Sequence, residues 1–520
     1  MNFLRTHWFW LSTFAVLVVA VVSIFSPLTP RYPYPYDSAD YMYAGTQGFL
    51  ANYMDRGSLS IPEMVSMGTQ LVREPEKRSE FSREIRQRRD MGFYRHYHGP
   101  MFAYWIALCG SVGVSTETAF RNAGFVVHVG SSLILMLAFW SLFPAWPRVG
   151  GLMAGSLLLF NRTALVTTVE ITQHLVFLPL AILTLWSLGM FARTIEARWW
   201  YVTSVLVGLC FVAVETTVLL VATIAVVLLF FRGDIARQWP GWRARLTILA
   251  KGIGLMLLTV LVVWPAGILK LGLVRGFAYL GYMALSRKTF SPGSALRTWQ
   301  YHFDRAPFEH WMLLTGLVLA LILWRKMAYR RESLPWLIYA FCYIAITTKI
   351  TLEFTHYRGT ISMVAIMATS MAIAHLWAQW GSAGRVALVV LAGVGLSGES
   401  IRYYEYLGTR EQPPTQGMVD YVRSGRVPEN RVLYVPFTAV PTLHFYYPEM
   451  KVVGYNPDWP VDRLVSELRA ADTAPEFLCE APVCQAVAQA TGGQPAAMVP
   501  LSSRRSSQPL YSMNTPGRRE

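Results

Sequence analysis

Repeated apolar segments constrain the fold of this chain more than any other feature of its sequence. Four clear examples are Trp8 to Phe25, Val126 to Leu142, His174 to Phe191 and Thr247 to Pro265. Each approaches the roughly 20 residues that a helix needs to cross a bilayer, and one cleaved signal peptide does not account for so many. Hydrophobic residues make up 53% of the chain, above the share of an ordinary soluble domain. The sequence therefore predicts an all-α polytopic membrane protein.

The charges between the apolar segments predict the topology. One segment, Pro100 to Gly113, is apolar but has only 14 residues, which is short for a span. If it lies in the membrane interface, loop arginines such as Arg148 and Arg193 share the cytoplasmic side with Arg5, as the positive-inside rule requires. We therefore expect a juxtamembrane helix there, a cytoplasmic N-terminus and an extracytoplasmic C-terminus. The eleven candidate spans lie near residues 8–26, 120–142, 149–165, 174–192, 200–214, 216–231, 246–268, 310–324, 334–348, 359–377 and 385–399.

The polar segments predict the domain organisation. A strand-like run, Arg431 to Pro436, precedes the helix-like segment Val461 to Ala471, a pattern that favours a small α/β domain. Cys479 and Cys484 are the only cysteine pair in this tail, which permits a disulfide in an oxidising compartment. The expected parts are a membrane domain at residues 1–399 with a first extracytoplasmic loop at 27–118, an extracytoplasmic α/β domain at 400–500, and a disordered tail at 501–520.

The net charge of +15 raises the question of nucleic-acid binding. The arginines fall in short clusters between apolar segments rather than on one basic domain, so membrane topology explains them better. We expect no nucleic-acid partner. The sequence also has no glycine-rich nucleotide loop followed by a helix, so a soluble nucleotide donor is unsupported. The compact layout favours a bacterial inner (plasma) membrane.

Two aspartates directly after the first apolar segment are the first candidates for chemistry. Asp37 and Asp40 are three residues apart, with Tyr41 beside them, and on a helix they would share one face. A carboxylate there can act as general base for an attacking hydroxyl group, and the aromatic residues offer a platform for sugar rings. The alternative interpretation is an aspartate that caps an interfacial helix.

His96 and His98 lie further along the same loop, just before the predicted juxtamembrane helix. They are candidates for holding a phosphate or a metal ion. The alternative is that they anchor the interface, where amphipathic side chains are common. The metal remains unknown, because no complete ligand set accompanies the two histidines.

Ionisable residues at the ends of later spans extend the candidate site. The topology places Glu170, Glu215 and the segment Lys349 to Arg358 on the same side of the membrane as Asp37, and such residues usually face a cavity or a partner. Glu215 has the alternative interpretation of a loop residue that reaches water. Arg358, with His356, is the better candidate for a lipid phosphate, because a guanidinium group matches phosphate oxygens.

Short segments, in order along nearly the whole chain, carry a family resemblance. The segments are Asp37 to Tyr41, His98 to Tyr104, Ala119 to Arg121, Glu170, Phe211 to Glu215, His356 to Arg358 and Leu443 to Pro448. With them the chain resembles the membrane-embedded C-type (GT-C) glycosyltransferases, in particular the protein O-mannosyltransferase and lipid A aminoarabinose transferase branch. Where the family often has a second acid this chain has Ser38, and where it often has a lysine this chain has Glu215.

The resemblance implies an enzyme that moves a sugar from a polyprenyl phosphate to a lipid, glycan or protein acceptor at the outer face of the membrane. It implies an inverting displacement in which the family's acidic base maps most naturally onto Asp37, with Asp40 as the rival, and it leaves open which of the two acts. Glu170 would orient a substrate, and Arg358 with His356 would contact the departing phosphate. The sequence requires no cofactor, although a divalent cation at the phosphate is an alternative to these basic groups. A lipid-linked sugar transporter or flippase is the alternative function.

Overall fold

The fold is known from a computed structural model of the chain. The described ranges are 2–28, 36–54, 61–74, 98–277, 294–305, 307–323, 329–348, 359–409, 415–425, 427, 432–436, 439–455, 459–469, 476–491 and 510–514.

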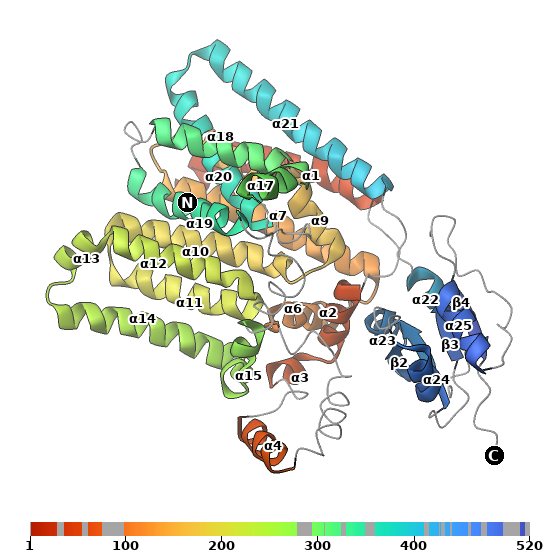
Figure 1. The fold of residues 1–520 in the computed structure, drawn as a ribbon. Helices are drawn as coiled ribbons and strands as arrows, with labels where there is room; N and C mark the ends of the chain where they lie inside the picture. The colour runs from red at the N-terminus through yellow and green to blue at the C-terminus, as the bar shows by residue number, and fades with distance from the viewer. Residues whose placement is uncertain are drawn as a thin grey trace.

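Helices make up the first part of the chain in its described ranges. They form a bundle in which successive helices fold back on one another (Figure 1). Its elements are α1 (Asn2–Leu28), α2 (Tyr36–Thr46), α3 (Phe49–Tyr53), α4 (Ile61–Arg73), α6 (Met101–Ser111), α7 (Glu117–Leu142), α8 (Val149–Phe160), α9 (Arg162–Glu170), α10 (His174–Thr194), α11 (Ala197–Ala213), η3 (Glu215–Thr217), α12 (Val218–Phe230), α13 (Arg232–Gln238), α14 (Trp242–Val263), α15 (Pro265–Leu269), α17 (Ala295–Arg305), α18 (Pro307–Leu323), α19 (Arg330–Thr347), α20 (Gly359–Gln379) and α21 (Ser382–Thr409).

The helices confirm an integral membrane protein with several spans. In the described part of the chain, six helices are long and apolar enough to cross a bilayer: α1, α7, α10, α14, α20 and α21. The number rises to eight if the bent pairs α8–α9 and α12–α13 each form one span. Each of the eleven predicted ranges overlaps at least one helix, but α11, α18 and α19 fall short of a span by length or composition. The count of eleven, like the orientation of the chain, stays a prediction.

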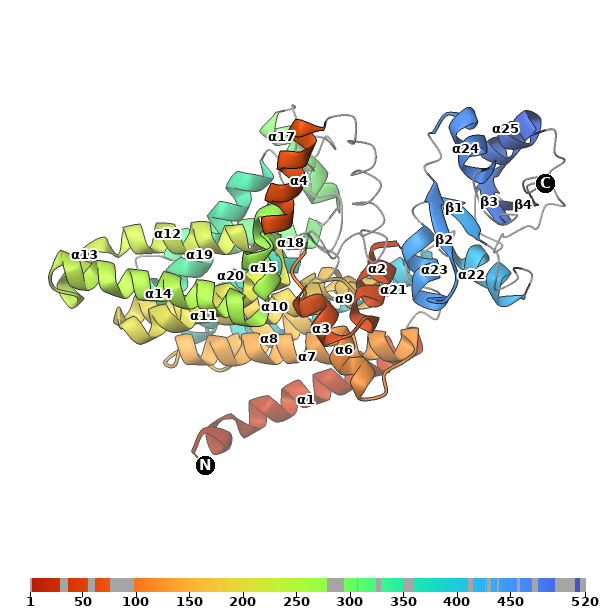
Figure 2. The same cartoon turned by 90° about the horizontal axis from the view of Figure 1, so that it is seen from below.

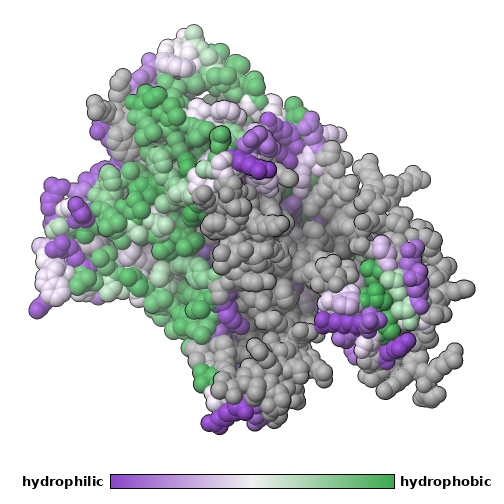
Figure 3. Space-filling view, in the orientation of Figure 1, coloured by the Kyte–Doolittle hydropathy of each residue, from purple (hydrophilic) through white to green (hydrophobic). Residues whose placement is uncertain are grey.

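The bundle has a buried centre and an apolar periphery. In the apolar stretches of α10 and α20, 72% of the residues are buried inside the protein, whereas in those of α14 and α21 only 11% are. The space-filling view shows hydrophobic residues spread over the outside of the bundle (Figure 3). A helix that is apolar all round and exposed suits a lipid environment. The peripheral helices therefore face the position that lipid tails would occupy.

The last part of the chain forms the expected α/β domain. Strands β1 and β2 pair in parallel, as do β1 and β3, and helices α24 and α25 pack together beside the sheet. Cys479 and Cys484 form the disulfide that the sequence permits. The elements are α22 (Thr415–Arg423), β1 (Leu433–Pro436), α23 (Val440–Tyr446), β2 (Val452–Tyr455), α24 (Val461–Arg469), β3 (Glu476–Glu480), α25 (Ala481–Thr491) and β4 (Leu510–Asn514).

The prediction of a disordered tail at 501–520 is wrong for residues 510–514. These residues form β4, which pairs antiparallel with β3 from Glu476 to Glu480 and completes the sheet order β2-β1-β3-β4. Without β4, the outer edge of β3 would present unpaired backbone groups. The composition of the tail is polar, but ladder hydrogen bonding to an existing edge can stabilise a strand that composition alone does not indicate.

The α/β domain contacts the membrane bundle through α23. This helix packs against α2, as Figures 1 and 2 both show. The His444 and Tyr43 rings lie 5.5 Å apart across this contact. Burial lowers the pKa of His444, although a hydrogen bond with the Val452 backbone opposes this effect. The neutral imidazole therefore suits this contact better than the charged one.

We expect acid to weaken this contact through His444. Because its pKa is lower in the folded protein than in the unfolded chain, the unfolded chain binds the proton first as the pH falls below about 6.5, so stability is lost there. In His444→Gln, which does not titrate, thermal stability should fall less than in wild type between about pH 7 and pH 5. Equal losses in both proteins would contradict the assignment.

Gly45 sets how closely α2 approaches α6. A Cβ atom at Gly45 would lie 2.3 Å from both Cβ and Cγ2 of Ile106, closer than atoms can pack. Ile106 is buried and β-branched, so its side chain has little room to move. Glycine at this position therefore lets α2 lie against α6.

Gly45→Ala should separate α2 from α6 and lower the stability of the protein by about 1–3 kcal/mol, the usual cost of overpacking. Thermal unfolding of the purified protein in detergent measures the effect. Gly110→Ala in α6 is the matched control, because nothing lies within 4 Å of a Cβ atom there. If the two variants unfolded at the same temperature, the close approach would not matter to stability.

Candidate active site

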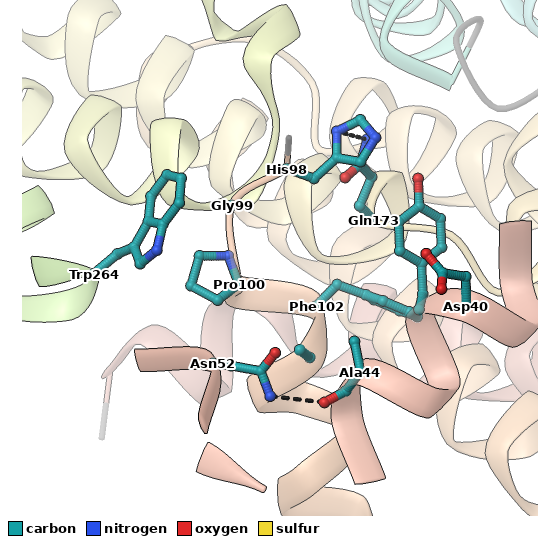
Figure 4. A pocket seen from close by; sticks show the side chains of 11 residues that line it. Asp40, Ala44, Asn52, His98, Gly99, Pro100, Phe102, Gln173 and Trp264 are labelled. Atoms are coloured by element: carbon teal, nitrogen blue, oxygen red, sulfur yellow. Dashed lines mark hydrogen bonds between the residues drawn. The ribbon is translucent and has the colours of Figure 1, made fainter. Parts of the chain in front are cut away.

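A pocket opens where α2 and α6 meet the ends of α10 and α14. Asp40 enters it from α2, His98 from the segment before α6, and Trp264 from the end of α14 (Figure 4). Tyr41 of α2 also lines the pocket. It gathers polar groups from segments that are far apart in the sequence, against a hydrophobic wall. Its lining residues are Asp40, Tyr41, Ala44, Asn52, His98, Gly99, Pro100, Phe102, Ala103, Gln173 and Trp264.

Asp40 is the buried acid of this pocket. Its side chain is 2% exposed, and it lies in the fifth position of α2 rather than at the helix start. The helix-capping interpretation is therefore wrong for Asp40. Asp37 lies in the first turn of the same helix, so the two aspartates do share α2, but the side chain of Asp37 lies outside the described residues. Asp40 is thus the acid whose position in the pocket is known.

His98 is held by an acid from a distant segment. Its Nδ1 atom lies 2.9 Å from each carboxylate oxygen of Glu215, and the Gln173 amide nitrogen lies 3.3 Å from the same Nδ1. Glu215 is 6% exposed, in the short helix η3 between α11 and α12. The Tyr41 ring meets the His98 ring edge-on, with centroids 5.8 Å apart. A carboxylate beside one ring nitrogen fixes the orientation of an imidazole, so the site presents a positioned histidine.

Gly99 explains how His98 can lie so close to α11. A Cβ atom at residue 99 would lie 2.0 Å from the Val212 carbonyl oxygen and 2.4 Å from its carbonyl carbon. Both are backbone atoms, which cannot turn aside as a flexible side chain can. Only glycine permits this approach. The contact places His98 next to Glu215, which follows shortly after Val212 in the chain.

Glu170 lies against α2 but outside the pocket. It is the last residue of α9, and its backbone oxygen accepts a hydrogen bond from the Ser38 hydroxyl group. Its carboxylate accepts a second hydrogen bond from the Tyr406 hydroxyl group at 3.0 Å. The Ser38 contact joins α9 to the helix that carries both aspartates.

The structure brings some of the predicted site residues together and leaves others undetermined. Asp40, Tyr41 and His98 line one pocket, and Glu170 contacts the same helix. The interpretation of Glu215 as a water-exposed loop residue is wrong, because it is buried against His98. His96, His356 and Arg358 lie outside the described residues.

Sequence reasoning did not identify Gln173, Asn52 or Trp264 as parts of the site. A signal existed for Gln173, which follows Glu170 by three residues and precedes a span. Within the described ranges, no three His, Cys, Asp or Glu side chains are grouped as a metal ion would need. Whether a divalent cation takes part therefore stays a prediction.

Comparisons with known proteins show what this chain resembles. Residues 97–264 match the family model of dolichyl-phosphate-mannose-protein mannosyltransferases. The structure of ArnT from Cupriavidus metallidurans bound to undecaprenyl phosphate is similar, with a TM-score of 0.60 and 14% identity over 97% of this chain and 98% of that one. The apo oligosaccharyltransferase of Archaeoglobus fulgidus has a TM-score of 0.54 and 10% identity over 92% of this chain and 70% of that one. A search of curated proteins gave no match.

The resemblance predicted from the sequence is confirmed. At these identities the solved structures show a shared fold, and the family match covers the segment that contains His98, Glu170 and Glu215. The protein has the fold of the C-type membrane glycosyltransferases. It pairs His98 with Glu215 at the position where the sequence departs from the common lysine of the family.

Glu215→Gln should impair sugar transfer, because the neutral amide cannot hold His98 as a carboxylate does. Hydrogen bonds to charged groups contribute about 1.5–3 kcal/mol, so we expect a loss of roughly 10- to 100-fold in rate. Transfer rates of the purified variant in proteoliposomes measure it. Glu196→Gln removes an exposed carboxylate that pairs with Arg198, and it should leave the rate unchanged. A fully active Glu215→Gln protein would show that the pair has no part in transfer.

Proposed function

We propose that this protein transfers a sugar from a polyprenyl-phosphate donor to the hydroxyl group of a lipid, glycan or protein acceptor. The observation that carries the proposal is a buried carboxylate, Asp40, in a pocket with Tyr41 and the positioned His98, within a C-type glycosyltransferase fold. The similar ArnT was solved with bound undecaprenyl phosphate. An archaeal oligosaccharyltransferase, AglB, was solved with an inhibitory peptide and a dolichol phosphate, with a TM-score of 0.51.

The chemistry is a single in-line displacement with inversion at the anomeric carbon. The acceptor oxygen forms a bond to that carbon while the bond from the carbon to the phosphate oxygen breaks. The acceptor proton passes to an aspartate, and polyprenyl phosphate departs with the electron pair. A base must lie within hydrogen-bond reach of the proton it takes. Asp40 is the candidate whose side chain is known to line the pocket. Asp37, on the same helix, is its rival.

The departing phosphate needs positive charge but no general acid, because a phosphate ester is a good leaving group. Arg358 with His356, together with the basic residues of the segment 269–308, are the candidates from the sequence. A divalent cation at the phosphate is the alternative. Glu170 would orient the acceptor or the donor from the end of α9. The proposed location is the face of the membrane that carries the α/β domain, predicted to be extracytoplasmic.

Replacing the base should abolish transfer while leaving the fold intact. We expect Asp40→Asn to reduce the rate by about 10²- to 10⁴-fold, the usual contribution of general base catalysis. Release of undecaprenyl phosphate from an undecaprenyl-phosphate-linked sugar in proteoliposomes, followed by mass spectrometry, measures it. Asp37→Asn tested in parallel identifies which aspartate is the base.

Asp420→Asn is the control, since Asp420 is half exposed on α22 in the α/β domain. If Asp37→Asn and Asp40→Asn both transferred sugar at the wild-type rate, the proposed mechanism would be wrong. Envelope glycans compared with and without the protein would identify the acceptor. If the lipid-linked sugar crossed the bilayer without transfer, a flippase would replace the glycosyltransferase.

A further inference from the structure

The helix that carries Glu170 is a short segment set off by a sharp bend. The axis of α9 is bent by 46° from that of α8, and Asn161 lies at the break. The Asn161 side-chain oxygen accepts a hydrogen bond from the Ala164 backbone nitrogen at 2.9 Å, so it caps α9. Asn161 is fully buried. A break in a buried helix frees backbone groups that water cannot reach, so protein groups must satisfy them.

An acid from α21 satisfies the start of α9. Glu399 accepts a hydrogen bond from the Arg162 backbone nitrogen at 3.0 Å and from the Asn161 amide nitrogen at 3.3 Å. Glu399 as a whole residue is 3% exposed. The first N–H groups of a helix have no partner within it, and a negative charge at this end is favourable. Glu399 therefore acts as a cap that comes from another helix.

A second acid, Glu309 of α18, completes the N-terminal contacts. It accepts hydrogen bonds from the Asn161 amide nitrogen at 3.2 Å and from the Thr163 hydroxyl group. One side-chain amide therefore donates to two buried carboxylates. The start of α9 is fixed to α18 and α21 together.

The other end of α9 is held under strain. Ile171, directly after Glu170, has φ +48° and ψ +83°, a left-handed conformation that a β-branched residue rarely adopts. Such a conformation persists when surrounding contacts fix it. Arg121 of α7 donates to the Val169 carbonyl oxygen at 3.1 Å, and Ser38 of α2 donates to the Glu170 carbonyl oxygen. These contacts fix the backbone of Glu170.

Tyr406 of α21 fixes the carboxylate itself. Its hydroxyl group donates to Glu170 Oε1 at 3.0 Å, and the Arg162 guanidinium lies 5.4 Å from the centroid of the Tyr406 ring. Glu399 and Tyr406 are seven residues, or about two turns, apart on α21, so they lie on one face roughly 10 Å apart. From Arg162 to Glu170 α9 rises about 12 Å. The two side chains therefore match the two ends of α9.

We propose that α21 holds α9 at both ends, and that Tyr406 is a positioning residue which sets the Glu170 carboxylate for sugar transfer. This inference rests on the proposed function of Glu170 as a residue that orients a substrate. A carboxylate on a free helix end rotates among several conformers, and a hydrogen bond to one oxygen selects one of them. Helix α21 precedes the α/β domain in the chain, and α23 of that domain packs on α2. Helix α21 therefore links the domain to the site.

A double-mutant cycle tests the role of Tyr406 in catalysis. Tyr406→Phe should lower kcat about 10-fold, as expected for a lost hydrogen bond to a charged group, with little change in the donor KM. In a Glu170→Gln background the same change should cause no further loss, because the group it positions is gone. Tyr404→Phe is the control, since Tyr404 is exposed on the same helix. Equal losses in both backgrounds, or no loss in the wild-type background, would overturn the inference.

Hydrogen exchange tests the holding of α9 without relying on catalysis. Peptides covering residues 162–173 of the full-length protein in detergent should exchange faster in Tyr406→Phe and in Glu399→Gln than in wild type, with no change in Tyr404→Phe. Unchanged exchange in both site variants would overturn the inference. If wild type transferred no sugar while exchange responded as expected, the proposed function would fail and the holding of α9 by α21 would stand.

Discussion

The break between α8 and α9 is the constraint on which the arrangement of the site depends. Continuous helices satisfy their own backbone in a bilayer, but a bend of 46° at Asn161 leaves polar groups that only the protein can satisfy. Asn161 and Glu399 meet that need, and two carboxylates are buried side by side as a result. The bend also redirects the chain, because α9 leaves the line of α8 and ends against α2, where Glu170 contacts Ser38. A straight helix would carry Glu170 away from the aspartates.

Hydrophobic patterning predicts the long apolar helices and their order, because lipid exposure dictates composition over some twenty residues at a time. It predicts Asp40, Tyr41 and His98 in one loop after the first span, and in the structure these three residues line one pocket. Pairing across long sequence separation is not encoded in any local pattern. Glu215 lies 117 residues from His98, and only the fold shows that it is a partner rather than a loop residue.

In the α/β domain, too, contacts between distant segments determine structure that the local sequence does not predict. The sequence predicts one of its strands, near Arg431 to Pro436, and one of its helices, near Val461 to Ala471, but β4 at residues 510–514 has no local signal strong enough to separate it from a polar tail. Its stability comes from the edge of β3, which lies well before it in the chain. The same tertiary dependence applies to Glu399 and Tyr406, whose positions on an apolar, mostly lipid-exposed helix gave no indication that they contact α9.

The charges around the pocket restrict where the donor phosphate can lie. Asp40 and Glu215 are acidic, and His98, which Glu215 holds, carries at most one positive charge in return. The described lining therefore offers a phosphate no net positive charge, and a phosphate placed beside Asp40 would meet repulsion. This arrangement suits the acceptor hydroxyl group and the base. If transfer proceeds as proposed, the cation for the leaving group would come from beyond this wall, from Arg358 or a divalent ion, with the anomeric carbon lying between the two.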